Sequence, residues 1–197
     1  VDELFSEHFK LEDVLLKLHE RTDLPQTMRE AALRQALLRG DDPMPLLQRS
    51  LADCVDSEQA KPTYELALMR ATVAKGMREN ITGTPEWELE GLNDLAMAAA
   101  YLRVSRYQEA SKLLEKKVEP STRNIETRGF FGQREQALRL LFLCMAQSQT
   151  GQHQEADRSL RQAQQSVLTD VELSQRAELL DLLAEVETMV RSMTPAG

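Results

Sequence analysis

Two segments of this chain repeat one pattern: an apolar helix, a short break, a ring and a second helix. The first segment runs from Leu92 to Leu114 and the second from Leu138 to Leu160. In each, small residues lie within the first helix, and the ring is followed by Gln-Glu-Ala and a leucine four residues later. A hairpin of this kind cannot bury its apolar face alone, so neighbouring hairpins stack into a solenoid. The repeat predicts such a stack, and solenoids mostly bind other proteins.

The composition favours helices along the whole chain. Only 7 prolines and 8 glycines occur in 197 residues, and the runs between them are rich in Leu, Ala, Glu, Gln and Arg. These residues are good helix formers, whereas the strand-favouring residues Val, Ile and Thr are scarce. We therefore expect an all-α protein that is long enough for a sizeable core.

Helix-breaking residues divide the chain into three parts of one domain, residues 1–197. Residues 1–84 are expected to form degenerate N-terminal helices, over 2–21, from Pro25 to Gly40, through Leu46 to Cys54, and over 57–79. The pair broken at Gly40 resembles a degenerate copy of the later hairpins. Residues 85–168 hold the two clear hairpins, at 85–104 with 106–118 and at 133–150 with 153–168.

Residues 170–194 are expected to form a last helix, which Asp170 caps. Its apolar stripe is Leu179, Leu182, Leu183, Val186, Val190 and Met193. Such a stripe needs an apolar surface to cover, so the helix either covers the open end of the stack or lies in its groove.

An insertion separates the two hairpins. Ala110 and Ala156 are 46 positions apart, whereas a bare repeat of this class takes about 34 residues. The extra stretch, 118–132, carries Phe130 and Phe131 between two glycines. Two interpretations stay open: these rings pack over the hairpin junction, or they form a loop tip that contacts a partner.

The hairpin pattern resembles the tetratricopeptide repeat. The residues that match its small and large packing positions are Ala98, Tyr101, Tyr107, Ala110 and Leu114 in the first copy, and Cys144, Ala146, Gly151, His153, Ala156, Leu160 and Ala163 in the second. Small residues allow close helix approach, and the ring fills the space beside them. The resemblance implies a right-handed α-α superhelix of antiparallel hairpins with a C-terminal capping helix.

A longer resemblance covers residues 1 to about 167. The residues that carry it are Leu4-Phe5, Glu12-Asp-Val14, Leu24-Pro25, Arg29-Glu-Ala-Ala-Leu33, Arg39-Gly-Asp-Asp-Pro43 and Leu143-Cys-Met-Ala146 with Gly151. They are similar to the region after the kinase domain in planctomycete-type serine/threonine protein kinases. This implies a non-catalytic accessory domain of a larger bacterial signalling protein. The glycine-rich loop, His-Arg-Asp and Asp-Phe-Gly motifs of a kinase itself do not occur.

In tetratricopeptide proteins the first helix of each hairpin lines a concave surface. The resemblance therefore implies a partner groove lined by Leu95, Ala99, Leu102 and Arg103, and by Leu141, Phe142, Met145, Ser148 and Gln149. These side chains are mainly apolar, which does not suit a partner's terminal carboxylate. The groove either accepts a helix of a protein partner or is already occupied by this chain's own last helix.

The charge distribution leaves one alternative function. A net charge of −8 argues against nonspecific binding of nucleic acid or anionic membranes. From Arg103 to Arg139, however, nine Arg and Lys residues stand against five Glu, so this stretch has a net charge of +4 and the rest −12. Either these cations decorate solvated helix faces, or they form a phosphate-binding patch of a nucleic-acid regulator.

Catalytic and metal-binding patterns are missing from the sequence. Cys54 and Cys144 are expected to be reduced core residues, which suits a cytoplasmic protein. The histidines are His8, His19 and His153; the first two are too far apart for one metal, and the third stands at the ring position of the repeat. No zinc, phosphate-loop or triad pattern occurs. We expect no enzyme activity, no metal and no cofactor.

The apolar runs and the ends of the chain bear on its location and on whether it belongs to a longer protein. No apolar run approaches the roughly 18–20 residues that span a bilayer, and no signal peptide is recognisable. The chain starts at Val1 and ends in Thr-Pro-Ala-Gly, so we expect a domain excised from a longer protein. The leading hypothesis is a cytoplasmic scaffold domain that binds a protein or peptide partner.

Overall fold

A computed structural model describes residues 14, 17–18, 21–37, 43–77, 86–115 and 131–193. The helices are α3 (Gln26–Leu37), α4 (Pro43–Val55), α5 (Lys61–Met77), α6 (Glu86–Arg103), α7 (Tyr107–Leu114), α8 (Phe131–Gln149), α9 (His153–Thr169) and α10 (Ala177–Met193), with a 3-10 turn, η2, at Leu173–Gln175. The described part of the chain contains no strand, which confirms the expected helical class. None of its helices has the length and apolar character that crossing a membrane requires.

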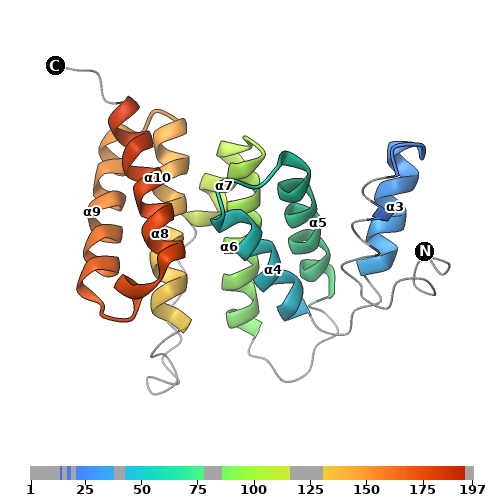
Figure 1. Cartoon of the computed structure of the whole chain (residues 1–197), viewed down its shortest axis with the longest axis horizontal. Helices are drawn as coiled ribbons and strands as arrows, with labels where there is room; N and C mark the ends of the chain where they lie inside the picture. Colours follow the sequence, from blue (N-terminus) through green and yellow to red (C-terminus); the bar gives the residue numbers. More distant parts are fainter. Residues whose placement is uncertain are drawn as a thin grey trace.

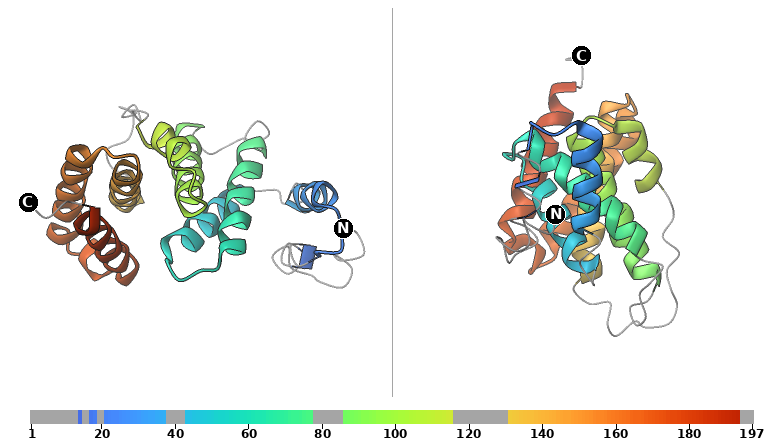
Figure 2. Two further views of the ribbon diagram at one scale, coloured as in Figure 1. Left: turned by 90° about the horizontal axis from the view of Figure 1, so that it is seen from above. Right: turned by 90° about the vertical axis from the view of Figure 1, so that its right-hand side faces the viewer.

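The helices stack as three hairpins, α4–α5, α6–α7 and α8–α9 (Figure 1). The first helix of each later hairpin packs on both helices of the hairpin before it: α6 contacts α4 and α5, and α8 contacts α6 and α7. Helix α10 contacts α8 and α9 in the same way. It therefore takes the place that the first helix of a fourth hairpin would take, and it lies on the same side of the molecule as α4 (Figure 2).

The hairpin at the N-terminal side of this stack differs from the expected one. The prediction paired the helix ending near Gly40 with the next helix, but α4 pairs with α5, and α3 contacts α5. The α4–α5 seam is joined by polar bonds as well as apolar packing: Ser50 Oγ donates to the Ala67 carbonyl at 2.7 Å, and Arg70 pairs with Asp53 at 2.5 Å. Gly40 and most of the expected first helix, 2–21, lie outside the described residues.

The turns of the two clear hairpins have the same geometry at a spacing of 46 residues. Ser105 has φ 64° and Gly151 has φ 80°, both in the left-handed region. The following residue donates its backbone N–H five positions back in both copies, from Arg106 to Tyr101 and from Gln152 to Gln147, each at 2.8 Å. This is the arrangement in which a left-handed residue ends a helix. The repeat seen in the sequence is thus a repeat of backbone conformation.

The small residues of the pattern occupy the helix contacts, as expected. Ala98, Ala110 and Ala146 are completely buried, and Ala156 is 1% exposed. His153 is a correction: Tyr107 at the same position of the first copy is half-buried, but His153 is exposed. An imidazole is polar enough to remain in water where a phenol ring gains from burial.

The last helix buries the expected stripe but begins later than expected. Five of the six stripe residues are buried, and Met193 is half-buried. The Asp170 carboxylate accepts the backbone N–H groups of Glu172 at 2.9 Å and Leu173 at 3.0 Å. Asp170 therefore caps the short turn η2 and not α10, which begins at Ala177. Of the insertion, Phe130 lies outside the described residues and Phe131 opens α8, so its two interpretations stay predictions.

The left-handed turns give a test of this backbone repeat. Gly151→Ala is expected to lower the free energy of unfolding by about 1 kcal/mol, because an alanine at φ 80° is strained although its Cβ would meet no atom within 4 Å. Ser105→Gly should raise it by up to about 1 kcal/mol. Urea unfolding monitored by circular dichroism measures both changes.

Gly76→Ala is the matched control, since its Cβ also meets nothing within 4 Å but its backbone is helical. It is expected to raise the stability by up to about 1 kcal/mol. Equal effects of the two glycine substitutions would contradict the left-handed assignment.

Candidate functional site

Most residues of the expected partner groove are covered in the folded chain. Leu95, Ala99, Leu141 and Phe142 have no exposed surface, and Leu102, Met145 and Ser148 are 5% exposed or less. Only Arg103 and Gln149 are half-buried. The apolar positions are covered because α4 packs on α6 and α10 packs on α8. The surface of these residues is thus taken up within the chain, along α8 by the last helix itself, and their contact with a partner stays a prediction.

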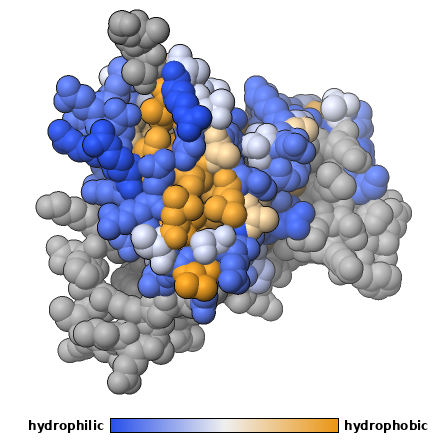
Figure 3. All heavy atoms as spheres, turned by 60° about the vertical axis from the view of Figure 1, so that its left-hand side comes forward, coloured by the Kyte–Doolittle hydropathy of each residue, from blue (hydrophilic) through white to orange (hydrophobic). Residues whose placement is uncertain are grey.

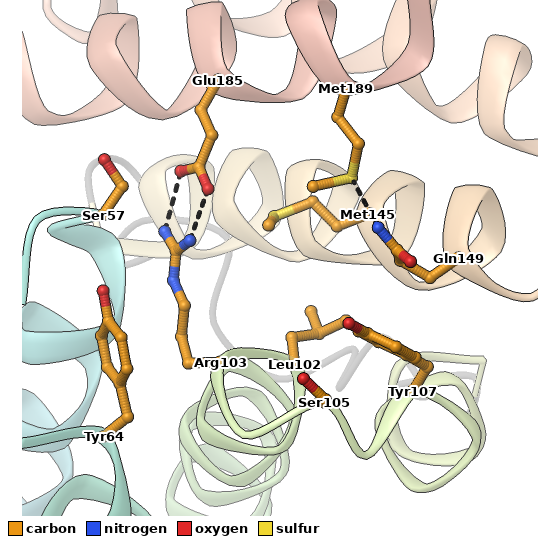
Figure 4. A pocket seen from close by; sticks show the side chains of 10 residues that line it. All are labelled: Ser57, Tyr64, Leu102, Arg103, Ser105, Tyr107, Met145, Gln149, Glu185 and Met189. Carbon is orange, nitrogen blue, oxygen red and sulfur yellow. Dashed lines mark hydrogen bonds and ion pairs between the residues drawn. The ribbon is translucent and has the colours of Figure 1, made fainter. Parts of the chain in front are cut away.

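Four of the nine expected residues nevertheless meet at a central pocket of about 230 Å³ (Figure 4). Its lining comes from the α4–α5 turn, α5, α6, the α6–α7 turn, α7, α8 and α10. The lining residues are Ser57, Tyr64, Leu102, Arg103, Ser105, Tyr107, Met145, Gln149, Glu185 and Met189. The structure thus brings Leu102, Arg103, Met145 and Gln149 together, while Leu95, Ala99, Leu141, Phe142 and Ser148 are outside this lining.

An ion pair between Arg103 and Glu185 stands inside the central pocket. Arg103 Nη1 and Nη2 donate to the two carboxylate oxygens of Glu185 at 2.5 and 2.8 Å, and Nε donates to the Cys54 carbonyl at 2.8 Å. The guanidinium also lies 5.7 Å from the centre of the Tyr64 ring. Burial opposes the charge of Arg103, but the Glu185 carboxylate outweighs it and raises the pKa of Arg103. This pair joins α10 to α6, although α10 packs mainly on the next hairpin of the stack, α8–α9.

The ion pair separates a polar from an apolar side of the pocket. On one side lie Ser57 and Tyr64, whose hydroxyl donates to the Asp56 carbonyl at 2.9 Å. On the other side, Met145, Met189 and Leu102 lie around open space beside the ring of Tyr107 (Figure 4). Gln149 Nε2 contacts Met189 Sδ at 3.6 Å on this side. The arrangement provides an apolar recess, an amide at its edge and a fixed, internally neutralised charge pair.

The basic stretch from Arg103 to Arg139 is described in part, and the phosphate patch suggested for it stays a prediction. Its four described arginines are engaged within the chain. Arg103 pairs with Glu185, Arg106 with Glu109 at 3.0 Å, and Arg134 with Glu178 at 2.9 Å, while Arg139 donates to the Leu113 and Leu114 carbonyls at the end of α7. Lys112 is exposed, and Lys116, Lys117, Arg123 and Arg128 lie outside the described residues.

The cysteines are buried and free, as the sequence led us to expect. Burial raises the pKa of the Cys54 thiol to about 12 and that of Cys144 to about 11. Cys144 Sγ donates to the Ala156 carbonyl at 3.2 Å, which ties α8 to α9. Within the described ranges, no three His, Cys, Asp or Glu side chains lie close enough together to hold a metal ion.

Apolar surface also occurs at the C-terminal end of the stack. Figure 3 brings this end forward and shows apolar surface bordered by hydrophilic side chains. The large apolar residues exposed on α9, α10 and the turn between them are Leu168, Val171 and Leu180, at 60%, 71% and 36%. None of these three residues belongs to the pocket lining.

Comparison with protein-family models, curated proteins and solved structures finds no match to this chain. The helical class and the pocket are known from the helices and contacts of this chain alone.

Six lining residues were not predicted as site residues: Ser57, Tyr64, Ser105, Tyr107, Glu185 and Met189. A signal for one of them was present, because Arg103 ends an apolar helix and a buried arginine requires a carboxylate or carbonyl partner. Which of the 32 acidic residues supplies it could not be read from the sequence. Glu185 and Met189 are four residues apart beside the apolar stripe of α10, and only the placement of α10 turns them toward Arg103.

A double-mutant cycle tests the ion pair. Glu185→Leu alone is expected to lower the free energy of unfolding by about 2–3 kcal/mol, because it leaves the guanidinium of Arg103 buried without its carboxylate. The double variant Arg103→Met, Glu185→Leu should lose less than the sum of the single variants, with a coupling energy of about 1–2 kcal/mol. Guanidinium unfolding of the four proteins measures it, and strict additivity would show that the two side chains do not interact.

The reactivity of the two thiols tests whether α4 and α8 are buried as the structure shows. Burial raises the pKa of both thiols and shields them from reagents, so at pH 8 the folded chain should react negligibly with Ellman's reagent, whereas both cysteines should react fully in urea. Rapid reaction of either thiol in the folded chain would contradict the burial of α4 or α8.

Proposed function

We propose that this chain is a tetratricopeptide-like repeat domain that binds a protein or peptide partner and catalyses no reaction. In this proposal α4–α5, α6–α7 and α8–α9 are successive repeats of a right-handed superhelix, and α10 is its capping helix. The way each first helix packs on both helices of the preceding hairpin supports this architecture.

The observation that carries the proposed role is the central pocket shared by successive units of the stack. Stacked repeats create binding surfaces from side chains of several units, and here α5, α6, α8 and α10 all contribute. The pocket offers apolar side chains and hydrogen-bonding groups, which recognise part of a polypeptide.

We also propose that the domain is a cytoplasmic accessory region of a larger bacterial signalling protein. The support is the resemblance of residues 1 to about 167 to the region after the kinase domain in planctomycete-type kinases. A kinase motif set upstream in the same reading frame is the expected result, and a frame without one would reject this context while leaving the binding role intact.

The binding role is tested by affinity capture from an extract of the source cells. The immobilised chain is compared with Met189→Lys and Gln149→Arg, which alter half-buried pocket residues and should leave the fold intact. Leu95→Asp would be unsuitable, because Leu95 is completely buried and a carboxylate there would unfold the helix stack. We expect at least one protein whose recovery falls about tenfold with both pocket variants.

Met28→Lys is the matched control, since Met28 is 59% exposed on α3 and lies outside the pocket lining. It should retain the captured protein. Equal recovery by the wild-type and pocket variants would contradict a partner site at the pocket.

A further inference from the structure

The size of the central pocket limits what it can hold. Its volume of about 230 Å³ is below the range of about 300–1,000 Å³ that is usual for sites of drug-sized ligands and cofactors. A whole helix would require α10 to leave, together with its ion pair to Arg103 and its buried stripe. With α10 in place, the pocket accommodates one large side chain of an extended segment.

The apolar side of the pocket determines the kind of side chain. Leu102, Met145 and Met189 present branched and thioether side chains, and the ring of Tyr107 lies beside them (Figure 4). Methionine adapts its shape to unbranched and aromatic side chains alike. Gln149, at the edge, has an amide that can hydrogen-bond to the backbone of a segment passing over the pocket. The anchor is therefore a long apolar side chain such as Met, Leu or Phe.

The charged groups at the rim of the pocket indicate which charge a partner carries next to its anchor residue. Two of the charges near the pocket are neutralised within the chain, because Arg103 pairs with Glu185, and Arg106, between Ser105 and Tyr107, pairs with Glu109. Asp56 and Glu58 are exposed and flank the pocket residue Ser57. The Asp56 carboxylate accepts hydrogen bonds from Gln59 Nε2 at 2.6 Å and from the Glu58 backbone N–H at 2.9 Å, which lower its pKa and keep it ionised.

We propose that the central pocket binds an extended segment of another protein through one long apolar anchor residue, with a Lys or Arg close to the anchor in sequence. The anchor lies between Leu102, Tyr107, Met145 and Met189, and the basic residue lies at Asp56 and Glu58. This inference rests on the proposed function and adds the chemistry of the partner. Complementary charge at the rim selects the basic neighbour and speeds association.

Selection of a phage-displayed random peptide library on the full chain tests the proposal. We expect enriched peptides to share Met, Leu or Phe with Lys or Arg within three residues of it. The consensus peptide is then synthesised with a fluorescent label, and its dissociation constant is measured by polarisation. Met189→Lys should weaken binding at least about tenfold, since it removes apolar contact and adds a charge, while Met28→Lys should change it less than about twofold.

The charge at the rim is tested separately with two peptides. Glu58→Lys should weaken binding of the consensus peptide several-fold and reduce the salt dependence of its affinity. The same variant should leave binding unchanged for a peptide in which the basic residue is replaced by Gln. Glu58 is exposed in a turn, so the variant is expected to keep the wild-type melting temperature.

Several outcomes would overturn the inference: no enriched peptide, enrichment of acidic neighbours, or binding insensitive to Met189→Lys. Binding that is lost instead with Leu168→Lys or Val171→Lys would place the partner on the exposed apolar residues of the C-terminal end. In that last case the chain would still bind a protein, so the general role would survive while the pocket assignment failed. No enriched peptide together with unchanged capture from extracts by the pocket variants would reject both.

Discussion

The packing of α6 is the constraint on which the rest of the stack depends. Nine consecutive residues, 92–100, are buried, including Asn93 and Asp94. A helix that is buried on all sides must be surrounded, and α6 contacts α4, α5, α7 and α8. Its alanines permit this, because small side chains let several helices approach one helix closely. The buried polar side chain of Asn93 also joins two helices, because its Nδ2 donates to the Ala71 carbonyl of α5 at 2.8 Å.

The site arises where this buried helix ends. Arg103 is the last residue of α6 and lies where α4 also ends, so its guanidinium can satisfy the Cys54 carbonyl and still reach Glu185 on α10. Arg139 acts similarly at the end of α7. Arginines of the stack therefore complete the hydrogen bonds of neighbouring helix ends. Near Arg103 this leaves a pocket with a fixed charge pair, and the proposed binding role follows from that arrangement.

The local features of the fold could be predicted because their causes are local. Helix-forming runs, prolines, glycines and caps give the limits of α6, α8 and α9 to within a few residues, and the 46-residue spacing indicates the shared turn geometry. The partner of α4 could not be predicted, because α3 and α5 both follow helical patterns next to it. What distinguishes α5 is a set of cross-helix bonds, such as Arg70 to Asp53, between residues 17 positions apart.

Sequence alone therefore determined the helical class, the repeated hairpin and the burial of its small residues, because periodicity and propensity act within one or two turns of chain. Tertiary structure decided that α4 pairs with α5, that α10 covers α8 and α9, and that Glu185 meets Arg103 from 82 positions away. It also decided which of the nine predicted groove residues meet at one site: four line the pocket, and the other five lie elsewhere in the helix packing. Contacts between residues so far apart in sequence depend on how whole helices stack. Each helix has more than one face on which a neighbouring helix could pack.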